Sequence, residues 1–254
     1  MIKAVYKSIV PEKMRNDVHI YYRKLKSLFL KGENFYCPCC ERSSSKFLDK
    51  GNGLVVRKNA VCPNCGSLER SRLLKLYLEN ETKIFENSPK ILHFAPEDSL
   101  KNLLKLNPNY VDVDINPNLA SIEMDITEIT FPNDHFDLII CSHVLGHIPD
   151  EKKALKELYR VLKSGGDLFI LSLMDPHSAK TLEDRTIKTP KEKLNAYGES
   201  DLERLYGTDF LERIKTDDVQ IERIDYREHF SSTERTKMSL GNGEREIIYK
   251  ITKR

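Results

Sequence analysis

The chain has little net charge and no long apolar run. Its 254 residues carry 41 basic and 39 acidic side chains, a formal net charge of +2, so the chain as a whole is not drawn to nucleic acid. No segment approaches the roughly 18 consecutive apolar residues of a membrane-spanning helix, and no signal-peptide pattern opens the chain. Hydrophobic residues make up 39%, which is enough for a folded core. We therefore expect a folded, cytoplasmic protein without a membrane span.

Cysteine is nearly absent outside one short stretch. Five of the six cysteines lie between positions 37 and 65, and Cys141 is the exception. Clustered cysteines in a cytosolic protein indicate a metal site rather than disulfides. Cys141 comes at the end of an apolar run, and we interpret it as a small apolar residue that lines a pocket, not as a nucleophile.

The clustered cysteines form two pairs with the spacing of metal ligands. Two residues separate Cys37 from Cys40 and Cys62 from Cys65, and 21 residues separate the two pairs. Each Cys-Pro-x-Cys turn can present two thiolates to one tetrahedral ion, as in the zinc ribbons that this stretch resembles. Four thiolates would complete the shell of a structural Zn²⁺ and leave no position for a substrate. Reduced structural cysteines are the alternative, and Cys39 could replace a neighbour as ligand or point outward.

Composition divides the chain into three parts. Residues 1–33 carry eight Lys or Arg against three acids, with apolar residues at helical spacing. We expect a basic helical segment that packs on the protein and keeps its basic face solvated; a nucleic-acid-binding or membrane-surface helix is the alternative. Residues 34–70 form the zinc-ribbon-like module, in which two strands flank a Gly-Asn-Gly turn. Residues 71–254 form the main domain, and residues 174–207 are predicted to be a lid or ligand-binding insertion.

Apolar strands alternate with amphipathic helices in the main domain. The segments "ILHFA", "YVDVDI", "FDLIICS" and "DLFILSL" are typical of buried strands. Their alternation with helices predicts an α/β fold, a Rossmann-like, doubly wound, mostly parallel sheet with helices on both faces. Ser99 and Asp150 are predicted to begin two of the helices, and Gly165 and Gly166 to end the second. "VQIERIDY" and "EREIIYKITK" are predicted to close the domain as two further strands.

Polar residues gather at the predicted strand ends, the edge at which open α/β sheets bind ligands. "HFAPED" follows the first strand, Asp114 ends the second, Asp125 lies in "EMDITEITFP", and "CSH" follows the next. A carboxylate such as Asp114 can accept hydrogen bonds from both ribose hydroxyls. Asp125 can accept from the exocyclic amine of adenine, with an apolar or backbone contact from Ile126. The pattern favours a nucleoside site, whereas helix capping or loop solvation is the alternative use of these acids.

A longer stretch of the sequence resembles a known family. The run "MDITEITFPNDHFDLIICSHVLGHIPDEKKALKELYRVLKSGGDLFILSL" is similar to the central segment of class I S-adenosylmethionine-dependent methyltransferases of type 11. Together with "CPNCGSLERSRLLKLYL" and "LHFAPE", it resembles a subgroup with a cysteine-rich N-terminal module. The resemblance implies an antiparallel C-terminal strand and S-adenosylmethionine as cofactor. It implies these cofactor-binding residues: Phe94, Ala95, Pro96 and Glu97 at the methionine end, Asp114 at the ribose, Asp125 and Ile126 at the adenine, and Cys141, Ser142 and His143 in the cleft.

The sequence departs from the family pattern at two places. The turn Ala95-Pro96-Glu97 contains no glycine, whereas most members have a glycine-rich turn there that lets the backbone approach the cofactor. This chain also has a glycine, Gly146, directly before His147, whereas many members of the family have a glutamate at that position.

Methyl transfer from a sulfonium requires that the donor and the acceptor be held in position. A hydroxyl acceptor usually needs a general base as well. His143 and His147 have suitable ordinary pKa values and are the predicted catalytic residues, with Asp175 and His177 as competing candidates. Further residues of the insertion either recognise the acceptor or belong to a solvated lid. They are Tyr197, Asp201, Arg204 and Tyr206.

Three functions are compatible with these observations. The favoured one is a methyltransferase that acts on a small molecule or a glycan, such as a precursor of a polysaccharide or a secondary metabolite. The second has RNA or protein as acceptor, which the cysteine module and the basic segment motivate; nucleic acid is possible but not favoured, because charge is balanced. The third is a non-catalytic zinc-ribbon interaction protein on a methyltransferase scaffold, which the glycine-free turn motivates.

Overall fold

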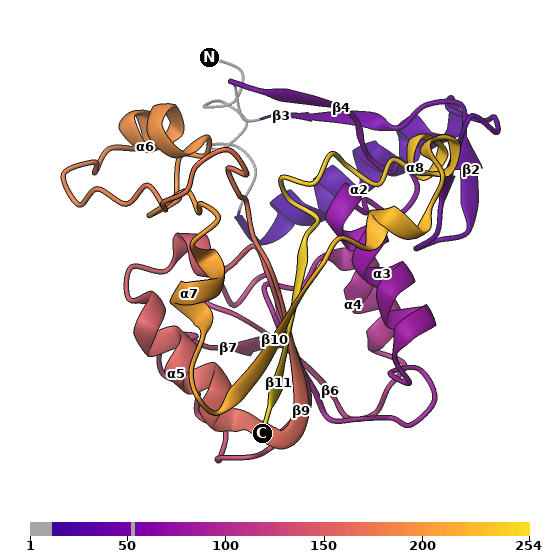
Figure 1. Cartoon of the computed structure of the whole chain (residues 1–254). Coiled ribbons are helices and arrows are strands. Elements are labelled where there is room, and N and C mark those ends of the chain that lie inside the picture. The colour runs from indigo at the N-terminus through magenta and orange to yellow at the C-terminus, as the bar shows by residue number, and fades with distance from the viewer. Residues whose placement is uncertain (1–11, 52–53) are drawn as a thin grey trace.

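The computed structural model describes residues 12–51 and 54–254. At its centre lies a seven-stranded sheet with the strand order β10-β11-β9-β8-β5-β6-β7 (Figure 1). The strands β5 to β9 pair in parallel, whereas β11 is antiparallel to both of its neighbours. The predicted mostly parallel α/β sheet with an antiparallel C-terminal strand is therefore confirmed. The strand bounds are β5 (Ile91–Phe94), β6 (Tyr110–Asp114), β7 (Ile122–Glu123), β8 (Phe136–Ser142), β9 (Leu162–Leu171), β10 (Val219–Ile224) and β11 (Ile248–Lys253).

Helices cover both faces of the sheet, and each face has its own apolar core (Figure 1). On one face, α5 (Glu151–Val161) and α7 (Phe210–Ile214) contribute Leu155, Leu158 and Phe210 to the first core. On the other, α3 (Glu69–Glu81) and α4 (Asp98–Leu104) supply the second. The other helices that follow α3 in the chain are η1 (Leu145–His147), α6 (Pro190–Tyr197), η2 (Tyr226–His229) and α8 (Ser232–Met238).

The ends of two helices differ in part from the sequence prediction. Asp150 caps α5 as expected, because its carboxylate accepts from the Lys153 N–H at 3.0 Å. The prediction that Gly165 and Gly166 end this helix is wrong: α5 ends at Val161, and β9 begins at the next residue and includes both glycines. A Cβ at Gly166 would lie 2.9 Å from the Asp137 carbonyl oxygen, so this glycine serves the close approach of two strands.

The predicted cap of α4 is also wrong. Helix α4 begins at Asp98, and Glu97 occupies the N-cap position without a capping hydrogen bond. Ser99 lies inside the helix, and its buried hydroxyl makes no hydrogen bond.

The cysteine-rich part consists of two small antiparallel sheets. Strands β1 (Phe35–Cys37) and β2 (Arg42–Ser44) form one, and β3 (Leu48–Gly51) and β4 (Val56–Val61) form the other. Arg72 of α3, which is completely buried, attaches this part to the main domain. Its guanidinium donates to the carbonyls of Ala60 and Ser239, at 3.0 and 2.6 Å, and its Cζ lies 5.0 Å from the Phe47 ring centroid.

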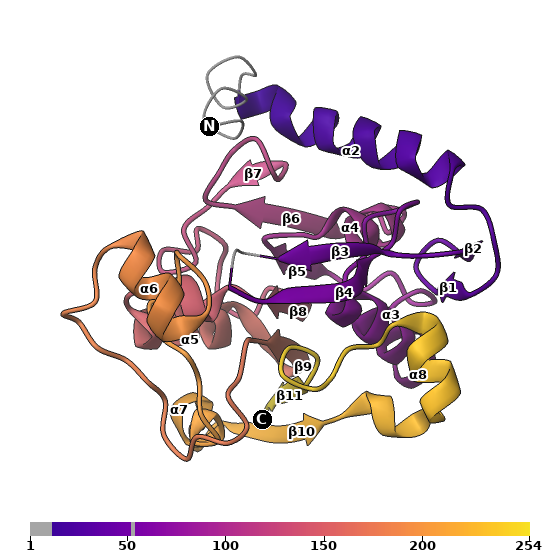
Figure 2. The same ribbon diagram turned by 90° about the horizontal axis from the view of Figure 1, so that it is seen from above.

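Helix α2 (Glu12–Leu28) lies along the outside of the molecule (Figure 2). The expectation that its apolar residues pack on the protein is wrong. Tyr21 is 66% exposed and Leu28 is 60% exposed, whereas Ile20, Arg23 and Ser27 on the opposite side are only half-buried. No helix in the described part of the chain combines the length and the apolarity that crossing a bilayer requires.

Candidate functional site

The turn after β5 takes a conformation that glycine normally supplies. Ala95 has φ 46, in the left-handed region that non-glycine residues seldom occupy. Its N–H donates to the Val113 carbonyl of β6 at 2.9 Å, which holds the turn against the neighbouring strand. Ala95 therefore takes up a left-handed conformation without the help of glycine, and the backbone strain falls on this residue.

Glu97 joins three elements at this edge of the sheet. Its Oε1 accepts from Arg70 Nε of α3 at 3.0 Å and from Ser142 Oγ at the end of β8 at 3.2 Å. Its Oε2 lies 3.7 Å from His93 Nε2, and neither of these two buried atoms has a hydrogen-bond partner. Burial alone would raise the pKa of Glu97, but His93 and the charge of Arg70 lower it to about 2.

Sequence reasoning included Glu97 and Ser142 but missed Arg70 and His93. The one available signal was His93 itself, a titratable residue in a strand that is otherwise apolar. Its Nδ1 lies 2.9 Å from the Tyr110 hydroxyl, so both ring nitrogens face polar groups inside the protein.

The two predicted nucleoside acids lie on adjoining segments, because the Met124 N–H donates to the Asp114 carbonyl at 2.9 Å. Asp114 is half-buried, and its carboxylate accepts from the Asn116 N–H at 2.8 Å. Asp125 is exposed. The side chain of Ile126 is packed in the core at 3% exposure, which leaves its backbone for any ligand contact.

An exposed apolar residue beside Asp114 was also missed. Ile115 is 70% exposed and directly follows the carboxylate at the end of β6. Its place in the sequence, next to the predicted ribose acid, was the signal that could have found it.

The end of β8 combines an inert thiol with a constrained histidine. Burial raises the pKa of Cys141 to about 12, so this cysteine stays protonated and acts as a small apolar residue. His143 has φ 56, and its Nε2 lies 3.0 Å from the Arg245 carbonyl oxygen. Because a carbonyl only accepts, Nε2 carries the proton and Nδ1 keeps its lone pair. Burial, and then the charge of Arg70, lower the pKa of His143 well below its usual value.

The second candidate base, His147, is tied to the insertion. It lies in η1, and its Nδ1 is 3.2 Å from the Asp201 carbonyl and 3.7 Å from Asp201 Oδ1. Glu199 brings a second carboxylate within 4.8 Å of the same group of atoms. His143 and His147 therefore contact different segments, and they do not form a pair.

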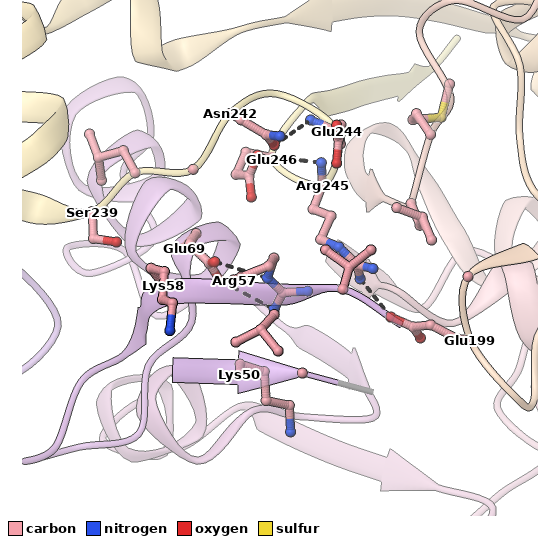
Figure 3. Close-up of a pocket in the computed structure, with 18 of the residues that line it drawn as sticks. Lys50, Arg57, Lys58, Glu69, Glu199, Ser239, Asn242, Glu244, Arg245 and Glu246 are labelled. Carbon is pink, nitrogen blue, oxygen red and sulfur yellow. Dashed lines mark hydrogen bonds and ion pairs between the residues drawn. The ribbon is translucent and has the colours of Figure 1, made fainter. Parts of the chain in front are cut away.

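A cavity of about 930 Å³ opens beside this edge of the sheet (Figure 3). The β3–β4 hairpin, the chain after β9, the end of α6 and the loop before β11 form its walls. The wall residues from the insertion include Asp175, His177, Tyr197 and Asp201, all four singled out from the sequence. Arg245 links the cavity to the strand ends, because its carbonyl binds His143 while its side chain faces the cavity.

Two arginine–glutamate pairs cross the cavity wall (Figure 3). Arg57 donates to Glu69 through Nε at 3.0 Å, and Arg245 donates to Glu199 through Nη1 at 2.7 Å. The first pair connects the cysteine-rich hairpin to α3, and the second connects the loop before β11 to the insertion. The wall is therefore charged, with both signs present.

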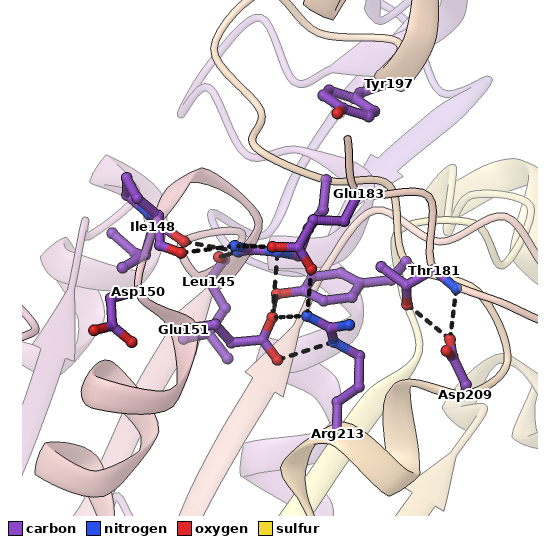
Figure 4. A network of polar contacts seen from close by, with 12 residues as sticks. Leu145, Ile148, Asp150, Glu151, Thr181, Glu183, Tyr197, Asp209 and Arg213 are labelled. Carbon is purple, nitrogen blue, oxygen red and sulfur yellow. Dashed lines mark hydrogen bonds and ion pairs between the residues drawn. The ribbon is translucent and has the colours of Figure 1, made fainter. Parts of the chain in front are cut away.

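Arg204 and Tyr206 do not line this cavity, and both are buried. They belong to a network of polar contacts with Glu151, which Figure 4 shows together with Glu183 and Arg213. Arg204, 1% exposed, donates to the carbonyls of Leu145 and Ile148 at 3.0 and 2.7 Å. Its Nε lies 3.3 Å from Glu151, a buried carboxylate that also accepts from Arg213 and from the Tyr206 hydroxyl. These residues fasten the insertion to the chain after β8.

The four predicted metal ligands come together at the base of the cysteine-rich part. Cys37 and Cys65 have their sulfurs 3.6 Å apart, and Cys40 and Cys62 theirs 3.8 Å apart. Thiolates about 2.3 Å from one tetrahedral zinc ion would be about 3.8 Å apart, so the four residues fit this metal. Hydrogen bonds from the surrounding thiols lower the pKa of Cys37, which favours a thiolate in the group.

Cys39 is not part of this group. It is buried, and its thiol lies 3.6 Å from the Ser71 carbonyl, to which it can donate.

Comparison with known proteins finds similarity to part of the main domain. Residues 71–170 match the family model of a methyltransferase domain. Relatives include the ubiquinone/menaquinone biosynthesis C-methyltransferase UbiE of Psychromonas ingrahamii, 40% identical over 65 residues that cover 26% of this chain and 26% of that protein. UbiE of Vibrio vulnificus is 39% identical over 59 residues, 23% of each chain. The chain thus spans about a quarter of the length of these relatives.

Solved structures show weaker likeness. The YcgJ protein of Bacillus subtilis has a TM-score of 0.48 and 16% identity, with 72% of this chain and 97% of that chain covered. A methyltransferase from Archaeoglobus fulgidus has a TM-score of 0.44 and 17% identity, with 70% and 91% covered. Residues 71–170 are thus similar to a methyltransferase domain, and the mostly parallel sheet agrees with the fold expected from the sequence.

Proposed function

We propose that this protein transfers a methyl group from S-adenosylmethionine to a polar small molecule or glycan held in the cavity. The observation that carries the proposal is the position of the cavity at the end of β9, the strand that pairs with β8. His143 connects the predicted cofactor residues to the cavity, since it directly follows β8 and binds the backbone of the cavity residue Arg245. A volume of about 930 Å³ is in the range of small-molecule sites.

The cofactor would lie across the ends of β5, β6 and β8. Asp114 would accept from the ribose hydroxyls, and the exposed side chain of Ile115 would offer an apolar surface to the purine. The backbone of Ile126 and the carboxylate of Asp125 would contact the adenine edge. The turn from Phe94 to Glu97, in which Ala95 takes up a left-handed conformation, would contact the methionine end.

The acceptor would be oriented mainly by charged and polar groups. Lys50, Arg57, Lys58 and Arg245 supply donors on the cavity wall, and Glu69 and Glu199 supply acceptors. Such a wall suits a ligand with many hydroxyl or anionic groups better than an apolar one. This chemistry supports the small polar or glycan class.

A neutral histidine supports general-base catalysis on an acceptor hydroxyl. His143 keeps its Nδ1 lone pair, and its lowered pKa holds the ring neutral at neutral pH. Bound cofactor would supply the activated methyl group, so the protein contributes positioning, exclusion of water and removal of the proton. His147, Asp175 and His177 are the alternative bases, because the latter two line the cavity and His147 contacts its rim residue Asp201.

Titration with S-adenosylmethionine, followed by calorimetry, tests the cofactor site. Asp114→Ala should weaken binding at least tenfold, because ribose hydrogen bonds to a charged group contribute about 1.5–3 kcal/mol. Glu86→Ala is the matched control, since Glu86 is an exposed carboxylate that precedes β5 at the opposite edge of the sheet. An Asp114→Ala variant that binds as tightly as the control would refute the cofactor placement.

We also propose that Cys37, Cys40, Cys62 and Cys65 hold a structural zinc ion. Elemental analysis of the purified protein should find one zinc per chain, and Cys62→Ser should lose it together with stability. Cys39→Ser should keep the metal, because Cys39 lies outside the ligand group. Equal zinc content in the two variants would contradict this assignment.

A further inference from the structure

Helix α2 is turned with its apolar side away from the protein. The half-buried positions Ile20, Arg23 and Ser27 recur at three- and four-residue intervals, so they mark the side that faces the protein. The Arg23 guanidinium lies against Gly66 of the cysteine-rich part, where an added Cβ would be 2.2 Å from Nη1. The helix therefore faces the protein with Arg23 and Ser27 beside a single apolar residue, Ile20, while most of its apolar residues face away, the reverse of the usual arrangement.

The outward side forms a continuous apolar stripe. Its members follow one another at alternating intervals of four and three residues, with a tyrosine beside them, and their exposed fractions run from 37% to 66%. They are Met14, Val18, Tyr21, Tyr22, Leu25 and Leu28. Phe29 extends the stripe beyond the helix and is 87% exposed. Isolated exposed apolar residues are ordinary, but a stripe along a whole helix indicates an interaction surface.

Basic residues border this stripe on both sides. Lys24 and Lys26 are exposed and flank Leu25, so each points about 100° away from it around the helix. Lys26 Nζ lies 4.6 Å from the centroid of the Tyr22 ring, which places its charge at the edge of the apolar stripe. Asp17 is the only acid among the α2 side chains that the structure describes.

This arrangement selects among possible partners. Pairing with a second copy would bring the lysine borders of two helices together, which like-charge repulsion opposes. A nucleic acid would engage the lysines and leave the central apolar stripe in water. An anionic bilayer surface satisfies both parts, because apolar and aromatic side chains enter the headgroup boundary while flanking lysines reach lipid phosphates. We propose that the outward face of α2 docks on an anionic lipid surface.

Sedimentation with lipid vesicles tests the proposal on the full chain. The protein should bind vesicles that contain phosphatidylglycerol, should bind pure phosphatidylcholine vesicles much less, and should be released by salt. Leu25→Glu should weaken binding about tenfold or more, since it removes a buried leucine from the interface. Leu106→Glu is the matched control, because Leu106 is 82% exposed outside this stripe.

A fluorescence measurement gives a second readout. The chain contains no tryptophan, so Tyr22→Trp provides a single reporter on the stripe. Its emission should shift to the blue on addition of phosphatidylglycerol vesicles and stay unchanged with phosphatidylcholine alone.

Other occupants give distinct results, each of which overturns the proposal. A concentration-dependent dimer that Leu25→Glu dissociates would identify a second copy. RNA binding that persists in Leu25→Glu, without vesicle binding, would identify a nucleic acid. Vesicle binding by a variant that starts at Glu12, without any binding by the full chain, would show that residues 1–11, outside the described residues, occupy the face in the native protein. Absence of binding to both kinds of vesicle would also refute it.

Discussion

Two groups of arginine–glutamate contacts in this protein use the same residue types in opposite surroundings. Beneath the insertion, Arg204 and Glu151 are 1% and 5% exposed, and backbone carbonyls take up further donors of the arginine. At the cavity, Arg245 and Glu199 form a similar pair, but both side chains border the open volume.

The two groups of contacts differ in whether water or a ligand can take the place of a lost arginine or glutamate. A buried charge that loses its counter-charge has no water to replace it, so the Arg204 network is committed to holding the insertion in place. A pair that borders a cavity can exchange one partner for a ligand group at little cost. Burial therefore separates arginines that fix the fold from arginines that are available for recognition.

Removing the buried arginine should have the largest effect. Arg204→Leu should lower the free energy of unfolding by about 3–5 kcal/mol, because it leaves Glu151 short of a partner and removes a donor from each of three carbonyls. Chemical denaturation measures this. Arg245→Leu is the control: Arg245 pairs at the cavity with Glu199, which is 27% exposed, so its loss should cost about 1 kcal/mol. Equal losses in the two variants would remove the distinction between the groups.

Glu97 is an intermediate case, a carboxylate almost sealed at the cofactor edge. Its pKa is lowered from 4.5 to about 2, so its stabilising contribution is present above pH 4.5 and is lost as the pH falls toward 2. The difference corresponds to roughly 3 kcal/mol at neutral pH. Glu97→Gln should therefore flatten the acid limb of the stability profile measured by thermal unfolding between those pH values. A variant with the same acid limb as the native protein would show that the carboxylate is not held in this way.

Disrupting the cavity pair should have the smallest effect on stability and a visible effect on turnover. Arg245→Gln removes the side-chain charge and keeps the backbone carbonyl that binds His143. With an acceptor found by a labelled-methyl transfer assay, KM for that acceptor should rise about tenfold while kcat changes little. Lys193→Gln, which breaks an ion pair with Glu203 away from the cavity, should leave KM unchanged. A fall in kcat without a change in KM would place Arg245 outside acceptor binding.

The parts that were predictable from sequence are those set by local patterns. The alternation of strands and helices predicted the sheet, and Asp150 was predicted to cap α5. The cysteine spacing predicted that four sulfurs lie close together. These features depend on residues close together in the chain. The stop at Gly165 was mispredicted because the helix ends where β9 must begin pairing with β8, which only the sheet determines.

Features that depend on distant contacts were not predictable. Arg204 and Asp201 were both candidates for acceptor recognition in a polar insertion. Only the fold shows that Arg204 is buried and that Asp201 borders the cavity. The spacing of apolar residues in α2 predicts a helix with one apolar side, but not whether that side faces the protein. The contact of Arg70 with Glu97 joins residues 27 positions apart in the chain.

The β3–β4 hairpin belongs to the cysteine-rich part and also forms one wall of the cavity. Zinc binding that tightens the sulfur cluster must then also stiffen that wall. Thermodynamic reciprocity requires that a ligand which stiffens the wall also strengthens zinc binding. An occupied cavity would raise the affinity of the cysteines for zinc, and the ratio of zinc affinities measured by competition with a chelator, with and without ligand, would report the strength of this coupling without any measurement of catalysis.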